Sequence, residues 1–295
     1  MSARRHVPLH PYLGRRIAFG TRHGKEHQVA GPFAEILGAT VLTPPDLDTD
    51  QFGTFTGDVG RVGTPAQTAR AKAELGATAL GVPTALGSEA SYGDPTGLLV
   101  PVHEELLMFV DLDRDIEVIE GQRSITTLPA PRRAQTLADL EPHLHRFGFP
   151  AQALVVRPAG HPTDRNRPPD PAHLSKGITE RTELDRALRR AASASPDGHA
   201  MVEADLRAHH NPTRRTVLRA LGDRLALRLN TSCPACASPG YGRTATVPGL
   251  PCRTCHRPTD LARADTHTCP ACPHTHTEPR PATTANPVSC PTCNP

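Results

Sequence analysis

The chain has 295 residues, enough for two or three domains, and 37% of them are hydrophobic, so a substantial core can form. Only 3% are aromatic and none is Trp, which predicts a core of mainly Ala, Leu and Val, and a formal net charge of +3 is too small to indicate nucleic-acid binding by itself. The N-terminal residues lack the apolar segment of a secretory signal, and no window nears the roughly 18 apolar residues that span a bilayer. We therefore expect a cytoplasmic protein without membrane contact.

Short strands and helices alternate through residues 1–124, which predicts an N-terminal α/β domain. Helices are expected over 25–37 and over 65–76, where Thr64 is a good N-cap and Gly76 a stop. Strands are expected over residues 15–21, 40–44, 79–87, 98–102, 105–112 and 115–121.

Basic residues cluster in the stretch FGTRHGKEH, directly after the first expected strand. Gly20 and Gly24 permit close approach of the backbone, and Lys25 can begin a helix whose free N–H groups attract anions. Arg22 and Lys25 are therefore candidate phosphate ligands. The alternative is an ordinary solvated turn, since basic strand-to-helix turns are common.

Two further stretches extend this candidate site. QTARAKA carries Lys72 on a helix, and GSEAS places Glu89 at the end of a strand. The order of a Lys turn, a helix and an acidic turn resembles the house-cleaning nucleoside triphosphate pyrophosphatases of the inosine-triphosphatase-like superfamily, whose helix pattern is Glu-Asn-Ala-x-x-Lys-Ala. Lys25, Ala69, Lys72, Ala73 and Glu89 carry this resemblance.

The resemblance implies a metal-dependent hydrolase of nucleotides or related phosphorylated small molecules. Lys72 would join Arg22 and Lys25 in binding phosphate. Glu89, together with an acid of the loop 48–58 such as Asp58, would hold Mg²⁺ or Mn²⁺ or orient the attacking water. In a structural interpretation, Glu89 merely caps a turn and Lys72 lies on a solvated helix face.

Position 67 departs from that family pattern. The pattern has a metal-binding glutamate there, and Gln67 cannot supply the negative charge that Mg²⁺ prefers. We therefore treat Gln67 as part of the candidate catalytic site and keep, as an alternative, a ligand sensor with a decayed pocket.

Residues 134–230 predict a second, smaller α/β unit, with helices expected over 134–148, 179–193 and 212–229 and strands over 153–158 and 199–206. The last strand and helix meet at a polar junction. Because strand carboxyl ends face the ligand crevice in open α/β folds, this junction is a second candidate site, and Lys176 can face the same crevice. A capped, salt-bridged turn is the alternative. The candidate residues are Asp205, Arg207, His209, the N-cap Asn211, and Arg214.

All eight cysteines lie in the C-terminal segment 231–295, as four Cys-x-x-Cys pairs. A two-residue gap lets both sulfurs of a pair face one ion, and two pairs complete a tetrahedral zinc site, so two structural Zn²⁺ are expected in a double zinc ribbon. Consecutive pairing is favoured, first with second and third with fourth, while a nested or cross-braced arrangement is the alternative. The expected ligands are Cys233, Cys236, Cys252, Cys255, Cys269, Cys272, Cys290 and Cys293.

The charge of this tail argues against nucleic acid as its partner. Residues 233–295 contain five arginines and three acids, and eight thiolates with two Zn²⁺ would bring the total to about two negative charges. Tyr241 is the tail's one aromatic residue, which leaves little surface for base stacking. A structural or protein-binding role is favoured, and a non-catalytic adaptor that binds protein or RNA is the alternative to an enzyme.

The chain also resembles, nearly end to end, an uncharacterised bacterial family known only as a domain of unknown function. The motifs that carry the resemblance include GTRHGKEHQVAGPF, DTDQFGTFTGD, VEADLRAHHNPTRR and the terminal CPTCNP. Members typically have Glu at the position of Gln67. The resemblance implies no activity.

Overall fold

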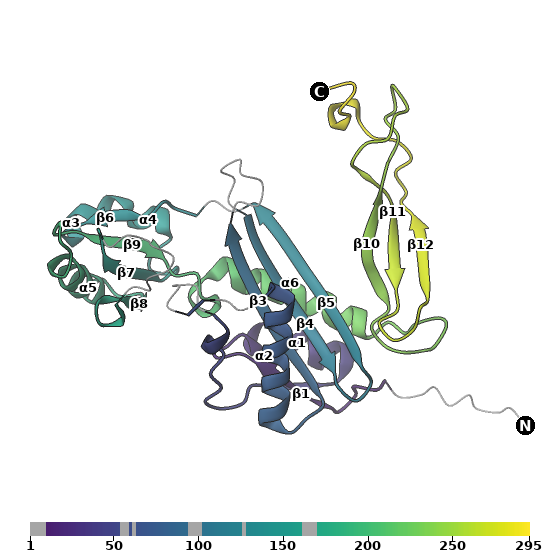
Figure 1. Ribbon diagram of the computed structural model, residues 1–295, viewed down its shortest axis with the longest axis horizontal. Coiled ribbons are helices and arrows are strands. Elements are labelled where there is room, and N and C mark those ends of the chain that lie inside the picture. The colour runs from purple at the N-terminus through teal and green to yellow at the C-terminus, as the bar shows by residue number, and fades with distance from the viewer. Residues whose placement is uncertain (1–9, 54–58, 61–62, 94–101, 126–127, 161–169) are drawn as a thin grey trace, which may run out of the picture.

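The computed structural model describes residues 10–53, 59–60, 63–93, 102–125, 128–160 and 170–295. Helices and strands form three parts, each built on its own sheet: a central five-stranded sheet, a four-stranded sheet beside it, and a three-stranded C-terminal ribbon (Figure 1). The mixed α/β class expected from the sequence is confirmed. No helix within these residues is both long and apolar enough to cross a membrane.

The central sheet has the strand order β2-β1-β3-β4-β5. β1 pairs in parallel with both β2 and β3, whereas β4 and β5 are antiparallel to their neighbours. The first three strands are therefore connected through helices and the last two by a tight turn. The strands are β1 (Arg16–Gly20), β2 (Thr40–Leu42), β3 (Thr84–Gly93), β4 (Val102–Asp111) and β5 (Ile116–Ile125).

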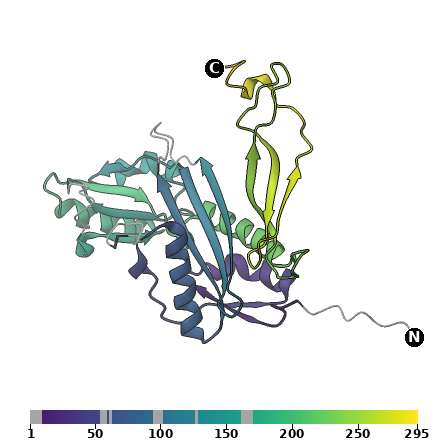
Figure 2. The same cartoon turned by 45° about the vertical axis from the view of Figure 1, so that its right-hand side comes forward.

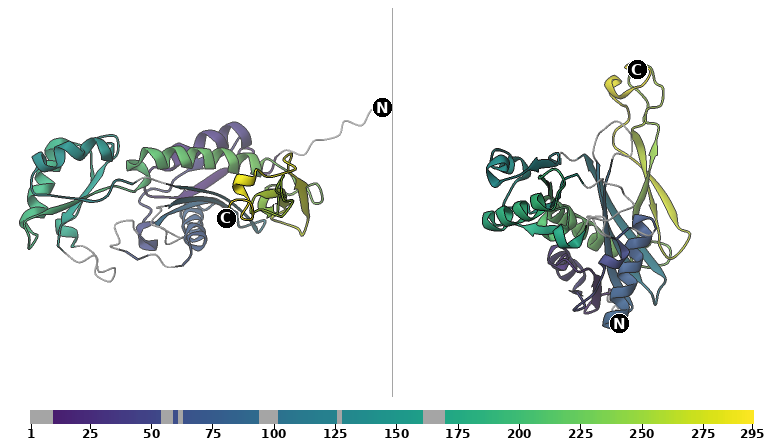
Figure 3. Two further views of the ribbon diagram at one scale, coloured as in Figure 1. Left: turned by 90° about the horizontal axis from the view of Figure 1, so that it is seen from above. Right: turned by 60° about the vertical axis from the view of Figure 1, so that its left-hand side comes forward.

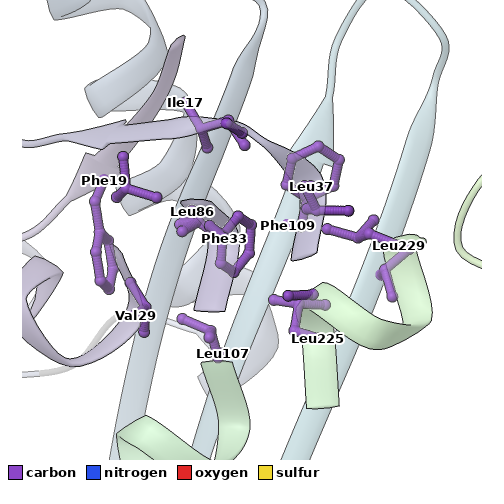
Figure 4. Packing of buried hydrophobic residues seen from close by; sticks show 14 of the residues in the cluster. Ile17, Phe19, Val29, Phe33, Leu37, Leu86, Leu107, Phe109, Leu225 and Leu229 are labelled. Atoms are coloured by element: carbon purple, nitrogen blue, oxygen red, sulfur yellow. The ribbon is translucent and has the colours of Figure 1, made fainter. Parts of the chain in front are cut away.

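Helices cover both faces of this sheet. α1 (Glu26–Leu37) and α6 (Pro212–Leu229) pack together on one face, and α2 (Pro65–Leu80) covers the other (Figures 2 and 3). Alternate strand residues point to opposite faces, so Phe19 packs under α1 and α6 while Ala18 packs under α2. The larger core lies on the first face and contains three of the four buried Phe residues among those that the structure describes (Figure 4).

α2 packs so closely on the sheet that only glycine fits beneath it. A Cβ at Gly20 would lie 1.7 Å from the Lys72 carbonyl oxygen, and one at Gly87 would lie 1.8 Å from that of Ala69. Gly76 contacts the backbone of Gly20 from the helix side. The expectation that Gly76 ends the helix was therefore wrong: it is a packing position, and α2 continues to Leu80 and ends at Gly81, which has a φ of 61°.

The second sheet has the order β6-β9-β7-β8, entirely antiparallel. The single helix expected over 134–148 is instead two short helices, because Pro142 interrupts the segment with a 3₁₀ turn. α6, which falls in the range 134–230, packs on the central sheet and not on this one. The elements are β6 (Arg132–Ala134), α3 (Leu137–Leu140), α4 (Leu144–Phe147), β7 (Leu154–Pro158), β8 (Ser175–Ile178), α5 (Arg181–Ser193) and β9 (Ala200–Ala204).

The C-terminal ribbon is an antiparallel sheet of β10 (Gly242–Pro248), β11 (Ala262–Thr268) and β12 (Thr275–Pro279). It stands beside the central sheet at the end of α6 (Figure 1). Arg228, in the last turn of α6, joins the two parts by donating hydrogen bonds to the carbonyl oxygens of Ile119 in β5 and Gly240 beside the ribbon.

Candidate functional site

A crevice opens at the carboxyl end of β1, between β1 and β3. The chain leaves β1 into α1 on one face of the sheet, and it returns to β3 through α2 on the other face. This divergence is a topological switch point, the place where open α/β sheets usually bind ligands. The cavity there measures about 130 Å³ and is lined by Gly20 and Thr21 of the first strand end and by Glu89 and Ala90 of β3.

Five cationic side chains line this crevice. Lys25 comes from the start of α1 and Lys72 from α2, while Lys176 belongs to β8 and Arg207 and Arg214 lie near the start of α6. The second sheet thus contributes to a site of the first. Because the crevice wall carries Asp50 and Glu89 as its acids, cations outnumber acids and the site favours an anionic ligand.

Lys72 and Glu89 form the most buried ion pair on the α2 side of the crevice. The Lys72 Nζ donates to Glu89 Oε2 at 2.6 Å, and the two residues are 8% and 7% exposed. Because both groups are buried, the loss of either partner would leave the other without its hydrogen bond in a poorly solvated position. On the opposite side, Lys25 Nζ donates to the Ser88 hydroxyl at 2.8 Å.

Arg214 is held by a carboxylate behind the crevice wall. Its Nε and Nη2 donate to the two oxygens of Glu105 at 2.7 and 2.8 Å, and its Nη1 donates to the Leu206 carbonyl oxygen at 2.6 Å. Burial by itself would raise the Glu105 pKa, but the charge of Arg214 and hydrogen bonds from His103 and Arg214 hold that pKa at about 2. The bidentate geometry fixes the guanidinium in one orientation.

Lys25 has an unusually acidic ammonium group. Burial, followed by the charges of Arg214 and Lys72, lowers its pKa to about 7, although Glu105 and Glu89 act in the opposite direction. An amine with a pKa near neutrality can change charge when a ligand binds.

Imidazole rings cover the outer side of the crevice. His23, which lines it, donates a hydrogen bond from Nε2 to Asp50 Oδ1 at 3.2 Å and stacks on His209 with ring centroids 4.7 Å apart. Burial lowers the His23 pKa to about 4 and the His209 pKa to about 3. Both rings are therefore neutral at physiological pH.

The structure places the other candidate residues around this crevice. Arg22 forms ion pairs with Asp48 and Asp50 and is more than half exposed. Gln67 lies at the exposed N-terminus of α2, where its side chain accepts a hydrogen bond from the Thr64 N–H in a capping box. Asp58 lies outside the described residues.

Asp205, Arg207 and Asn211 of the second candidate site form hydrogen bonds with neighbouring residues that fix the local backbone. Asp205 accepts hydrogen bonds from the Arg207 guanidinium and from the Gly177 N–H. Asn211 caps α6 by accepting from the Arg214 N–H at 3.1 Å, as its position predicts. The two candidate sites are therefore one region, since Arg207 and Arg214 line the same crevice as Lys25 and Lys72.

The eight cysteines form two quartets in which the ligand atoms lie within 4.8 Å of one another, and each quartet could hold one metal ion. Measured Sγ–Sγ distances run from 3.5 to 3.9 Å. Tetrahedral zinc with Zn–S bonds of about 2.3 Å places its sulfurs about 3.8 Å apart, so the donor set fits zinc. The N–H groups of Ala235, Thr254 and Ala271 donate to cysteine sulfurs, which disperses thiolate charge.

The favoured consecutive pairing of the cysteines was wrong. Pairs one and three form one quartet (Cys233, Cys236, Cys269, Cys272), and pairs two and four form the other (Cys252, Cys255, Cys290, Cys293). Each ribbon strand carries the chain from one end of the ribbon to the other, so successive pairs alternate between the ends. A strand of seven residues spans about 20 Å, too far for adjacent pairs to share an ion.

Comparison with known proteins identifies the family. A family model described as a domain of unknown function, DUF6671, matches residues 72–295. This chain belongs to that family. No curated protein matches the chain, and no solved structure does. The matched region includes Lys72, Glu89, Arg214 and all eight cysteines, while Lys25 precedes it.

The lysine content of the sequence is a signal for the crevice. The chain contains 33 Lys and Arg residues, but only three of them are lysines, and Lys25, Lys72 and Lys176 all line the crevice. In a chain that otherwise uses Arg, a lysine supplies what Arg cannot, namely a compact charge with an adjustable pKa.

Proposed function

We propose that the crevice binds the phosphate groups of a nucleotide or related phosphorylated small molecule. The gathering of all three lysines at the β1/β3 switch point is the observation that carries this proposal. Lys25, Lys72 and Lys176 would supply point charges that contact phosphate oxygens, and Arg214, whose fork is already bound to Glu105, would add positive charge to the crevice wall.

Hydrolysis is the reaction that the same crevice supports best. Glu89 and Asp50 both line it, and Mg²⁺ or Mn²⁺ is commonly held by one or two carboxylates together with substrate phosphates. The described residues hold no cluster of three metal-ligating groups at this position, so the divalent ion would enter with the substrate. In the reaction, a water oxygen forms a bond to phosphorus, the P–O bond to the leaving phosphate breaks, and Glu89 accepts the water proton.

The C-terminal quartets would each hold a structural Zn²⁺ and present the ribbon to a protein partner. A protein partner is favoured over nucleic acid because the zinc-loaded tail carries a small negative charge. A non-catalytic adaptor is the second candidate function, and the ribbon's separate position beside the central sheet supports it (Figure 1).

The proposal is tested with full-length protein, inorganic pyrophosphate and a panel of nucleoside triphosphates. Binding is measured by calorimetry and phosphate release by a coupled assay, with Mg²⁺ and Mn²⁺. We expect Lys25→Met to weaken binding at least tenfold and Glu89→Gln to abolish release while zinc content stays at two per chain. Arg219→Met, on the exposed surface of α6, is the control and should change neither.

Three outcomes separate the hypotheses. Binding with release that needs Glu89 supports the hydrolase. Binding without release in wild type, with release in Gln67→Glu, supports a sensor derived from an enzyme. Absence of binding by every probe rejects the phosphate site and leaves the adaptor, which pull-downs with Cys269→Ser as the control would then examine.

A further inference from the structure

A second cavity adjoins the crevice on the face of the sheet that carries α2. It measures about 370 Å³ and lies at the N-terminal end of α2, beside Pro65. Glu89 and Ala90 line both this cavity, called here the sheet-face cavity, and the crevice, so the two spaces meet across β3.

The floor of the sheet-face cavity contains apolar residues of β4 and β5. Leu106 of β4 lies opposite Gly121 of β5, and Ile119 lies two residues before Gly121 on the same face. Ile119 is 39% exposed, so part of its apolar side chain forms the surface of the cavity. A Cβ at Gly121 would meet only the Glu105 carbonyl oxygen, at 3.8 Å, so the space above this glycine is open.

The rim of the cavity is polar. Arg123 and Glu104 form an ion pair across β4 and β5, and the Ser91 hydroxyl donates to Glu104 Oε2 at 3.4 Å. Guanidinium donors and carboxylate acceptors can hydrogen-bond the edge of a heterocycle whose face lies on the apolar floor. Binding sites for small molecules commonly combine such an apolar surface with a few polar groups.

The sizes of the two spaces are complementary. The crevice, at about 130 Å³, is smaller than the roughly 300–1,000 Å³ of ordinary small-molecule sites, whereas the two together fall within that range. A ligand whose phosphates fill the crevice therefore has room for its remainder in the adjoining sheet-face cavity.

We propose that the sheet-face cavity holds the base of a nucleotide whose phosphates occupy the crevice. The base lies flat on the sheet at Gly121, between Leu106 and Ile119, with its polar edge toward Arg123 and Glu104. This assignment rests on the proposed phosphate site and narrows its ligand class from phosphorylated small molecules to nucleotides.

The test compares probes that share phosphates and differ in the base. Calorimetry of the full-length protein measures the affinity for inorganic pyrophosphate and for ADP, GDP, CDP and UDP. Gly121→Leu fills the sheet-face cavity without contacting the crevice lysines. Gly93→Leu is the matched control, because it makes the same change at a β3 position where a Cβ would meet no atom within 4 Å.

We expect at least one nucleoside diphosphate to bind wild type tenfold or more tightly than pyrophosphate. Gly121→Leu should reduce this advantage to less than threefold and leave pyrophosphate affinity unchanged, and Gly93→Leu should alter neither. If Gly121→Leu does not fold, Ile119→Trp fills the same space from the neighbouring position.

The proposal is overturned if pyrophosphate binds and no nucleotide binds more tightly, or if filling the cavity leaves nucleotide affinity unchanged. In either case the phosphate site itself stands. Failure of pyrophosphate and all four nucleotides to bind would instead reject the proposed function, and the base site with it.

Discussion

The crevice and the C-terminal ribbon differ in what holds their functional side chains in place. Crevice residues from Lys25 to Arg214 are positioned by a packed core and by buried ion pairs such as Arg214–Glu105. In the ribbon, β12 is exposed along its whole length and β10 along most of it, so burial contributes little there. In the crevice, the packed fold therefore positions the functional side chains. In the ribbon, the two cysteine quartets would hold the fold together once they bind metal.

Metal removal should produce the largest difference between the two regions, because the ribbon should unfold while the central sheet stays folded. Structural zinc contributes about 10–16 kcal/mol to folding in small zinc domains, and the ribbon has little apolar burial to replace it. After chelation, hydrogen exchange should show loss of protection in β10, β11 and β12, with β1, β3 and β4 still protected. A ribbon that stays protected in protein shown by mass spectrometry to be metal-free would contradict this comparison.

Glu105→Gln should lower the stability of the central sheet at the crevice wall. The substitution leaves the Arg214 guanidinium, 1% exposed, without its counter-charge, which costs about 3–5 kcal/mol of unfolding free energy. Chemical denaturation monitored on the central sheet measures the loss. Glu104→Gln, in an exposed pair with Arg123, is the matched control and should cost less than about 1 kcal/mol. Equal losses for the two variants would refute the assigned role of burial.

The affinity of the crevice for anions should fall as pH rises. Lys25 has a pKa of about 7 in the free protein, and an anion binds better to its protonated form. Affinity is therefore greatest below pH 7 and declines above it, by at most about tenfold for each pH unit. Calorimetry with sulfate, whose own charge is constant over pH 6–8.5, measures this slope. Lys25→Met should bind weakly with no slope, since His23 is already neutral.

A small gain in stability is expected in the ribbon. Ala237 follows the second cysteine of its pair with a φ of 61°, a conformation that glycine adopts without strain. Ala237→Gly should raise the stability of the zinc-loaded ribbon by about 0.5–1 kcal/mol. Ala235→Gly, between the two cysteines and without a positive φ, should lower it. Thermal unfolding of the holoprotein compares the two, and a lower Tm for Ala237→Gly would oppose the prediction.

The sequence predicts best those features that depend on neighbouring residues. Cys-x-x-Cys spacing identified all eight residues of the two quartets that could hold metal ions, and Asn211 before Pro212 identified the start of α6. The partners of each cysteine pair depend instead on the direction of whole strands, and the expectation of consecutive pairing failed for that reason. The expectation that Gly76 ends α2 was wrong for a similar reason, because its role is set by the backbone of Gly20, which is distant in sequence.

The crevice could be predicted only in fragments. Lys25, Lys72 and Glu89 were selected from local patterns, and Arg207 and Arg214 were selected as a separate site. These residues line one crevice because α6 packs on the central sheet and not on the second one. No local sequence pattern indicates that packing. Gln67 is a further example. It was interpreted as a mismatch to the family pattern, whereas its side chain belongs to a capping box that Thr64 could have suggested.

The scarcity of lysine also limits the positions at which lysine acylation can act on this protein. Enzymes or metabolites that acylate lysine side chains would find targets only at Lys25, Lys72 and Lys176, which all line the crevice. Each acylation removes one positive charge. Any lysine acylation of this chain would therefore reduce the positive charge of the crevice.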